Sequence, residues 1–196
     1  MTESRCGRSA GGAICVVMAA ACLSCGSGAA RRSSVPAPES APAGAAAPRP
    51  GQLVIAIPDI IFSDSSTEEV DQSAAHEARL RSMVDGLRAD VASNKRFAVL
   101  SLTCGGASCS RGGATLDDVR SEARAAGARL LLIGGVHKMS TLILWMNVTV
   151  VDVASGERVL VRVLSFRGDN DDAWRRAGSF AAKQVAEELQ ESLPKP

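Results

Sequence analysis

A long alternating stretch near the end of the chain most restricts what it can fold into. Residues 141–166 read TLILWMNVTVVDVASGERVLVRVLSF, and the two halves meet at ASGE, where Gly156 suits the left-handed conformation of a hairpin turn. In the second half, valines alternate with arginines and leucines, which is typical of a strand with one buried face and one partly solvated face. The stretch therefore predicts an antiparallel hairpin of two long strands.

Three shorter apolar runs precede this hairpin and are typical of strands that are buried on both faces. They occupy residues 51–62, 96–102 and 129–136, and they read GQLVIAIPDIIF, RFAVLSL and RLLLIGGV. Helical patterns separate the three runs, and strands that are joined by helices pair in parallel. The runs therefore predict the parallel half of a mixed sheet.

Two helices are predicted between these strands. The first covers residues 67–93, and Ser66 with Glu69 forms a capping box at its start. The second follows a capping pair, Thr115 and Asp118, and ends at a glycine. Apolar residues at helical spacing predict the buried stripes, which are Leu80, Met83, Val84, Leu87 and Val91 in the first helix and Leu116, Val119, Ala123 and Ala126 in the second.

A third helix, from about Asp171 to Leu193, follows the acidic stretch FRGDNDDAWRRA. A calcium loop that starts at Asp169 would need a glutamate at its twelfth position, which is Phe180. Adjacent carboxylates on a first helical turn also point in different directions, which argues against a catalytic pair. The stretch fits a helix start, with Asp169 or Asn170 as the cap and the next two aspartates at the positive end of the helix dipole.

The apolar stripe predicted for this third helix is Trp174, Ala177, Ala181, Val185 and Leu189. The whole pattern reads βαβαβββα. It predicts an α/β fold with a mixed sheet, parallel in its first half and antiparallel in the hairpin, and with helices packed on the sheet.

Residues 1–25 have the pattern of an export signal. Arg5 and Arg8 precede an uncharged run that is shorter than the roughly 20 apolar residues a lasting membrane span needs. A small residue before a cysteine is typical of lipoprotein processing, which predicts lipidation of Cys25, with Cys22 as the alternative. Cleavage without lipidation and a retained membrane anchor are the other interpretations.

Residues 26–50 form an Ala/Pro-rich tether that lacks the apolar residues of a core. Residues 51–196 then have the length of a single domain. The chain has 22 Lys and Arg against 21 Asp and Glu, and removal of residues 1–25 makes the two numbers equal. A balanced chain with no Tyr and few other aromatic residues is not typical of nucleic-acid binding.

Cys104 and Cys109 are the two cysteines of the domain and lie in LTCGGASCS. In an oxidising compartment, such a pair predicts a structural disulfide, with a redox role or free thiols as alternatives. The spacing differs from the CxxC pattern of thiol oxidoreductases, and no second cysteine pair or nearby histidine completes a zinc site. No metal or cofactor is predicted.

Catalytic constellations are also missing from the sequence. His76 lies among Ala, Gln and Glu, which predicts a solvated helix face, and His137 follows the third strand next to Lys138. Neither histidine has a second imidazole at ligand spacing. The glycine-rich segments match neither of the phosphate-binding patterns. We therefore expect the protein not to be an enzyme.

The hairpin offers a candidate partner surface. Trp145 and Asn147 share one face of their strand, and this face points to solvent or to a groove if the helices cover the other face. An exposed Trp beside an amide is common at binding surfaces. The alternative is that Trp145 packs under a helix. Arg167, Asp169 and Asn170, before the last helix, complete the candidate surface.

The same region carries a recurrent pattern: Gly-x-x-x-Lys-x-Ser-x-Leu-Ile, Met-Asn-Val, Val-x-Asp-x-Ala-x-Gly and Arg-Gly-x-x-Asp-x-x-Trp, at residues 134–174. It resembles a family of small exported bacterial proteins of unknown function. The fold is also similar to the amino-terminal domain of the translocation protein TolB and to curli-secretion-type lipoproteins. The resemblance implies envelope assembly or docking, not catalysis.

These features together predict an exported, lipid-anchored domain on the periplasmic side of the bacterial envelope, at the outer membrane. We expect it to bind another envelope protein or to associate with copies of itself. The alternative is a periplasmic protein that binds a small molecule or assists an exported enzyme.

Overall fold

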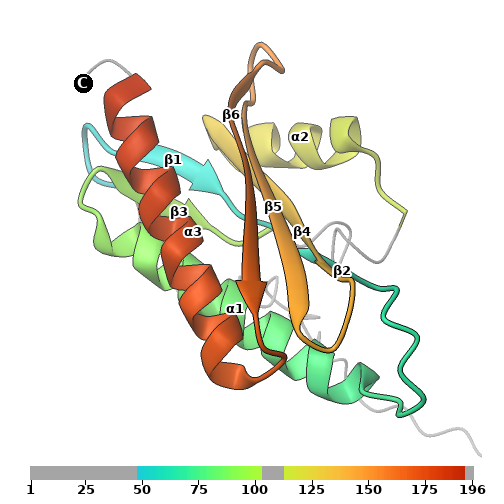
Figure 1. The fold of residues 1–196 in the computed structure, drawn as a ribbon. Helices are drawn as coiled ribbons and strands as arrows, with labels where there is room; N and C mark the ends of the chain where they lie inside the picture. Colours follow the sequence, from blue (N-terminus) through green and yellow to red (C-terminus); the bar gives the residue numbers. More distant parts are fainter. Residues whose placement is uncertain (1–47, 103–112, 193–196) are drawn as a thin grey trace, which may run out of the picture. The chain divides into compact units, whose positions relative to one another are not determined.

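A computed structural model describes residues 48–102 and 113–192, which form a mixed α/β domain (Figure 1). Six strands and three helices lie within these residues, so the predicted fold class is confirmed. Cys22, Cys25, Cys104 and Cys109 lie outside the described residues. In chain order the elements are β1 (Leu53–Ala56), β2 (Ile61–Asp64), α1 (Ser73–Ser93), β3 (Phe97–Leu100), α2 (Leu116–Ala125), β4 (Leu130–Lys138), β5 (Ile143–Asp152), β6 (Arg158–Arg167) and α3 (Asp171–Ser192).

The strands form one sheet in the order β3-β1-β4-β5-β6, and β2 pairs with β4 off this path. β1 runs parallel to β3 and β4, and β2 runs parallel to β4. β4, β5 and β6 are antiparallel neighbours. Gly156 adopts a φ of 79° at the hairpin turn, which a glycine tolerates without strain. The parallel first half and the antiparallel hairpin are therefore both as predicted.

The single strand predicted at the start of the domain is two strands. β1 ends at Ala56 and β2 begins at Ile61, and both strands pair with β4. Pro58 lies in the break, where its missing N–H removes a possible ladder hydrogen bond. The break lets β2 pair further along β4, so that Asp64 lies beside Lys138 at the ends of the two strands.

The helices cover the sheet unequally. α1 and α3 lie side by side against one face of the sheet and bury the larger core, while α2 packs on the other face (Figure 1). Gly178 lets α1 and α3 approach closely, because a Cβ atom there would lie 2.8 Å from Cγ of Met83. The whole predicted stripe of α3 is buried: Trp174, Ala177, Ala181, Val185 and Leu189.

The capping predictions had different outcomes. Thr115 and Asp118 form the predicted capping box at the start of α2. Of that helix's predicted stripe, the two central residues are buried, whereas Leu116 and Ala126 at its ends are exposed. At α3, the side-chain oxygen of Asn170 accepts a hydrogen bond from the Ala173 amide at 2.9 Å. Asn170 is therefore the cap of α3, which leaves the Asp169 carboxylate available for other contacts.

Candidate functional site

Lys138 is charged and fully buried at the end of β4. Alternation along the strand places it on the same face as Leu130, Leu132 and Val136, which pack in the core beneath α1 and α3. An unpaired ammonium ion in such a place would cost several kcal/mol. Carboxylates therefore have to surround it.

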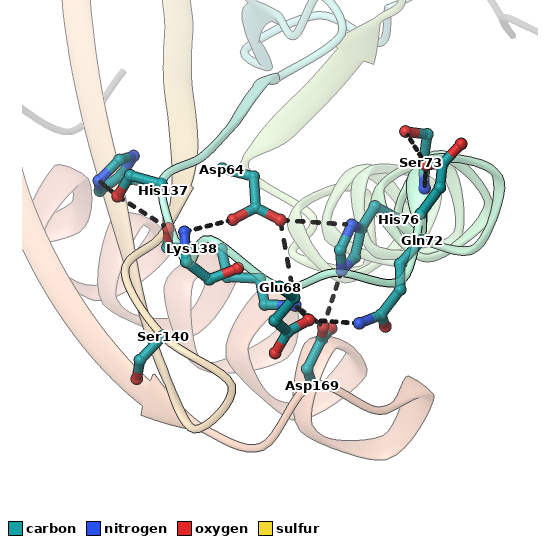
Figure 2. A network of polar contacts seen from close by, with 12 residues as sticks. Asp64, Glu68, Gln72, Ser73, His76, His137, Lys138, Ser140 and Asp169 are labelled. Carbon is teal, nitrogen blue, oxygen red and sulfur yellow. Dashed lines mark hydrogen bonds and ion pairs between the residues drawn. The ribbon is translucent and has the colours of Figure 1, made fainter.

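Asp169 provides the central carboxylate of this ion cluster (Figure 2). Its Oδ2 accepts hydrogen bonds from Nζ of Lys138 and from Nε2 of His76, each at 2.7 Å. Its Oδ1 accepts hydrogen bonds from Nη1 of Arg79 at 2.9 Å and from Nε1 of Trp174 at 3.0 Å. Only 8% of the Asp169 side chain is exposed. One buried carboxylate thus connects β4, α1 and α3.

Glu68 provides the second carboxylate. Its Oε2 accepts a hydrogen bond from Nζ of Lys138 at 2.6 Å, and the Gln72 amide donates to the same oxygen. Asp64 lies further out, with its Oδ2 4.0 Å from both Nζ of Lys138 and Nδ1 of His76. Figure 2 shows these side chains converging from β2, from α1 and from the connection between them. The ammonium ion is therefore held by two close carboxylates and faces a third.

The predicted capping box of Ser66 and Glu69 is wrong. α1 begins later, at Ser73, and has no side-chain hydrogen bond at its N-cap. The preceding connection turns toward the ion cluster, with Thr67 at a φ of 57° and Glu68 bonded to the buried ammonium ion. Charge-assisted hydrogen bonds are roughly twice as strong as neutral ones, so the ion cluster determines the path of the connection.

Aromatic rings border the cluster. The Phe62 ring lies 4.7 Å from the His76 ring and 5.6 Å from the Trp174 ring, between centroids. Phe166 meets Trp174 edge-on, with the centroids 6.0 Å apart. These rings reduce the polarity around the cluster, and hydrogen bonds between charged groups are stronger in such surroundings.

The pKa values of the two central groups reflect this pairing. Burial opposes ionisation of Asp169, but hydrogen bonds from His76, Lys138 and Trp174 outweigh it and lower the pKa of Asp169 to about 2. Burial likewise disfavours the Lys138 ammonium ion, but hydrogen bonds to Asp169 and Glu68 outweigh it and raise the pKa of Lys138 above its ordinary value. Both groups therefore stay charged across the physiological pH range.

The lowered pKa of Asp169 predicts acid sensitivity. Because the folded-state pKa is about 2 and the ordinary value is 3.8, protonation favours the unfolded chain. The stabilisation is fully present above about pH 5 and is lost as the pH falls through 3.8 toward 2, at a cost of about 2 kcal/mol. Carboxyl NMR titration should give a pKa near 2 for Asp169, and a value near 3.8 would contradict the buried pairing.

The cluster has little capacity for chemistry. Each Asp169 oxygen already accepts two hydrogen bonds, and the Lys138 ammonium ion lies between the carboxylates where a cation would bind. Among the described residues, no group of His, Cys, Asp and Glu is arranged to hold a metal ion. Lys138 and His76 are also buried, so a substrate in solution does not reach them.

A second polar group lies on the other side of the sheet. The Oγ atoms of Ser63 and Ser65 lie 2.8 Å from Nδ1 and 3.1 Å from Nε2 of His137. Hydroxyls thus contact both ring nitrogens, including the position where a catalytic triad would place its carboxylate. Among the described contacts of His137, no carboxylate orients the ring. The geometry does not add support for nucleophilic catalysis.

The exposed part of the sheet lies on this same side. α2 covers β1, β3 and the first part of β4, and none of the described helices covers the outer face of β5 and β6. Trp145 is 47% exposed and Val163 is 64% exposed there. Asn147 is exposed between them and pairs with Val163 across the ladder. We call this exposed surface the β5–β6 face. It is formed by the side chains of Ile143, Trp145, Asn147, Val161 and Val163.

The five residues of the predicted partner surface thus lie in different surroundings. Trp145 and Asn147 are exposed on the β5–β6 face, so the alternative in which Trp145 packs under a helix does not hold. Arg167 is exposed at the end of β6, and Asn170 caps α3. The Asp169 side chain, in contrast, is buried in the ion cluster.

Sequence reasoning missed most of the ion cluster. The prediction of a solvated face for His76 is wrong, because only 3% of the residue is exposed. A signal was present: His76 lies four residues before Leu80 and seven before Met83, which continues the apolar stripe of α1. Lys138 was missed because the predicted strand stopped at residue 136, and the observed strand continues to residue 138.

Known structures provide comparisons at low identity. TolB from Acinetobacter baumannii has a TM-score of 0.45 and 16% identity, over 71% of this chain and 29% of that chain. The PelC dodecamer from Paraburkholderia phytofirmans has a TM-score of 0.41 and 16% identity, over 71% and 85%. Lipoprotein GNA1162 from Neisseria meningitidis has a TM-score of 0.41 and 13% identity, over 69% and 99%. This chain thus spans less than a third of the TolB chain.

Sequence comparison shows the family of the chain, which the structural matches at low identity do not. A search of curated proteins gave no match. None of the helices in the described part of the chain is long and apolar enough to cross a membrane. Residues 54–185, which are more than half of the chain, match the model of a family described as "Protein of unknown function (DUF2380)". The chain therefore belongs to this family.

Proposed function

We propose that this protein is an exported, lipid-anchored envelope domain that binds another envelope protein and catalyses no reaction. The observation that carries the proposal is the exposed β5–β6 face, where Trp145 is 47% exposed and Val163 is 64% exposed. Large apolar side chains grouped on one face are typical of protein-binding surfaces. Trp is also among the residues that contribute most to binding when it becomes buried.

The surroundings of this face favour a protein partner. Asn147, Thr149 and Ser165 lie among the apolar side chains, so that a partner would meet hydrogen-bonding groups beside an aromatic anchor. The ion cluster lies on the opposite side of the sheet, where it fixes the ends of β4 and α3. A sheet that is fixed from behind loses little conformational freedom when its front face binds.

The amino-terminal sequence supports the location. Residues 1–25 have the pattern of an export signal, and lipidation of Cys25, with Cys22 as the alternative, would attach the chain to a membrane. The Ala/Pro-rich tether at residues 26–50 would then hold the domain away from the lipid surface. We place the domain on the periplasmic side of the outer membrane.

Crosslinking in intact cell envelopes tests the proposed contact. The full chain carries a C-terminal tag, and crosslinked partners are identified by mass spectrometry. We expect one reproducible envelope protein with the unmodified chain and at least about tenfold less of it with Trp145→Glu, because a carboxylate would be desolvated at the contact. Equal recovery of the partner with Trp145→Glu would contradict the proposed surface.

A matched variant controls for exposure and charge. Leu116 on α2 is 48% exposed, close to the value for Trp145, and lies on a different element. Leu116→Glu should leave the crosslinked partner unchanged. Lipid attachment is measured separately, as the mass of the amino-terminal peptide from the same preparation. Absence of a lipidated cysteine would contradict the anchor and leave the test of the β5–β6 face intact.

A further inference from the structure

β6 forms an open edge of the sheet. Among the described strands it pairs only with β5, and its ten residues contain no proline. The Gly168 amide donates to the Leu142 carbonyl, which sets the alternation of the antiparallel ladder. By this alternation, the residues whose N–H and C=O groups point away from β5 are Val161, Val163, Ser165 and Arg167.

The usual protection of an edge strand is weak here. Natural sheets protect their edges with short strands, prolines, bulges, charged side chains or a covering element, and of these β6 has its three arginines. The opposite edge, β3, has only four residues, whereas β6 has ten. The one irregularity of the β5–β6 ladder lies between Val150 and Val151, near the hairpin turn and away from the second half of β6. The second half of β6 is therefore free to pair with another strand.

A small groove runs beside this half of the edge. Its volume is about 220 Å³, and β6 contributes Leu164, Ser165 and Phe166 to its lining. α3 contributes Ala177 and Phe180, and Phe180 is 52% exposed. Small-molecule pockets usually measure roughly 300–1,000 Å³, so the groove suits one or two apolar side chains better than a separate ligand.

The edge and the groove share a positive charge. β6 carries three arginines and no acidic residue. Arg162 is paired with Glu188, but the described ion pairs include neither Arg167 nor Arg176, which both line the groove. The Asp172 carboxylate lies close enough to Arg176 for the two charges to interact, but the ion pair that Asp172 forms is with Arg175. Guanidinium groups on both sides of a groove favour a ligand with carboxylates. The open edge, the small groove and the positive charge therefore all fit a segment that is extended, carries an apolar side chain and is acidic.

We propose that β6 binds an extended acidic peptide segment of a partner protein, which adds a strand to the sheet edge. The peptide backbone would pair with Val163, Ser165 and Arg167, one of its apolar side chains would enter the groove, and its carboxylates would meet Arg167 and Arg176. This inference rests on the proposed function only in that both assign the domain a protein partner. The binding surface is the outward backbone of β6 and the groove beside α3, not the side chains of the β5–β6 face.

Two other candidates for pairing with the β6 edge fit its arginines less well. A second copy that pairs β6 with β6 would bring two strands with three arginines each together, and like charges on paired strands are destabilising. The tether at residues 26–50 contains Glu39 as its single acidic residue and several prolines, which donate no ladder hydrogen bond. A separate acidic segment satisfies both the edge and the arginines.

Fluorescence anisotropy with a designed peptide tests the inference. The probe is a fluorescein-labelled peptide of about eight residues in which Glu alternates with Val around one Phe, and the protein is the full chain in detergent. We expect saturable binding that weakens at high salt and weakens at least about tenfold when Lys replaces Glu in the peptide. No saturable binding, or equal binding of the two peptides, would overturn the inference.

Two variants locate the bound peptide. Arg176→Glu should lower the affinity at least about tenfold, because it places a carboxylate at the groove. Ser165→Pro should also lower it, because it removes an outward N–H from a position where an edge strand tolerates proline. Arg81→Glu on α1 makes the same charge change outside the groove lining and should leave the affinity unchanged. If Arg81→Glu and Arg176→Glu weaken binding equally, the peptide does not bind in the groove.

The β5–β6 face supplies the comparison that separates the two proposals. Trp145→Ala, which removes the aromatic side chain without placing a charge opposite Ser165, should leave peptide binding unchanged and lower the recovery of the crosslinked envelope protein. Arg176→Glu should leave the crosslinked protein unchanged, because Arg176 lies outside the β5–β6 face. Amide hydrogen exchange adds a direct reading, since strand addition should slow exchange at Val163 and Ser165 in the complex. Protection confined to β5 would overturn the proposed edge.

Discussion

Asp169→Asn is expected to destabilise the domain by about 3–5 kcal/mol at pH 7, as the loss of one partner from a buried ion pair does. Both Asp169 oxygens accept from two donors. An asparagine would turn its NH₂ group toward one of these pairs of donors, whichever way the amide is oriented. Thermal unfolding should show a fall in melting temperature of roughly 10–15 °C for a domain of this size.

The matched control for this variant is Asp172→Asn, three residues further along the chain. The Asp172 side chain is 68% exposed and pairs with Arg175 at 2.8 Å. Loss of such a surface pair should leave the melting temperature almost unchanged. A similar loss of stability in Asp172→Asn and Asp169→Asn would mean that helix capping, rather than the buried cluster, explains the effect.

Lys138→Met is expected to cost about 3 kcal/mol at pH 7, although methionine matches the length of the lysine side chain and is more apolar. Without the ammonium ion, the Asp169 and Glu68 oxygens that it held at 2.7 and 2.6 Å become neighbouring like charges. Asp169 would keep three hydrogen-bond donors, whereas Glu68 would keep one, the Gln72 amide. The loss should therefore come mainly from the uncompensated charge of Glu68.

Urea unfolding at pH 7 measures the loss of stability. Adding Glu68→Gln to Lys138→Met should recover part of the lost stability, because it removes the carboxylate that has lost its cation. Lys183→Met is the control, since Lys183 is 67% exposed and lies 3.8 Å from Glu187 on the surface of α3. If Glu68→Gln recovers none of the stability lost in Lys138→Met, the loss does not come from an uncompensated carboxylate.

Local patterns predicted the scaffold well because each depends on neighbouring residues. The hairpin around Gly156 and the stripe from Trp174 to Leu189 both occur as predicted. The alternation of the hairpin also put Trp145 and Asn147 on one face of their strand, and the structure shows that this face is exposed. Periodicity tells which side of an element is apolar, and burial follows it closely in these elements.

The ion cluster was harder to predict because its members are far apart in sequence. Lys138 lies 31 residues from Asp169 and 70 residues from Glu68, and no local period relates them. The acidic stretch before α3 offered two candidate caps, and only the three-dimensional structure shows that Asn170 takes the cap. Charged residues near the end of a buried strand were the available signal, since each requires a partner when it is buried.

The sequence separation within the cluster has a consequence for the proposed export. A chain that has been synthesised only as far as β6 contains Lys138 but lacks Asp169 and the buried face of α3. Its largest core would remain open, with a lysine that its main partner does not yet neutralise. We therefore expect the incomplete chain to stay unfolded until its last helix has emerged from the ribosome. A polypeptide that has to thread through a membrane pore before it folds benefits from this delay, because a prematurely compact domain would not pass.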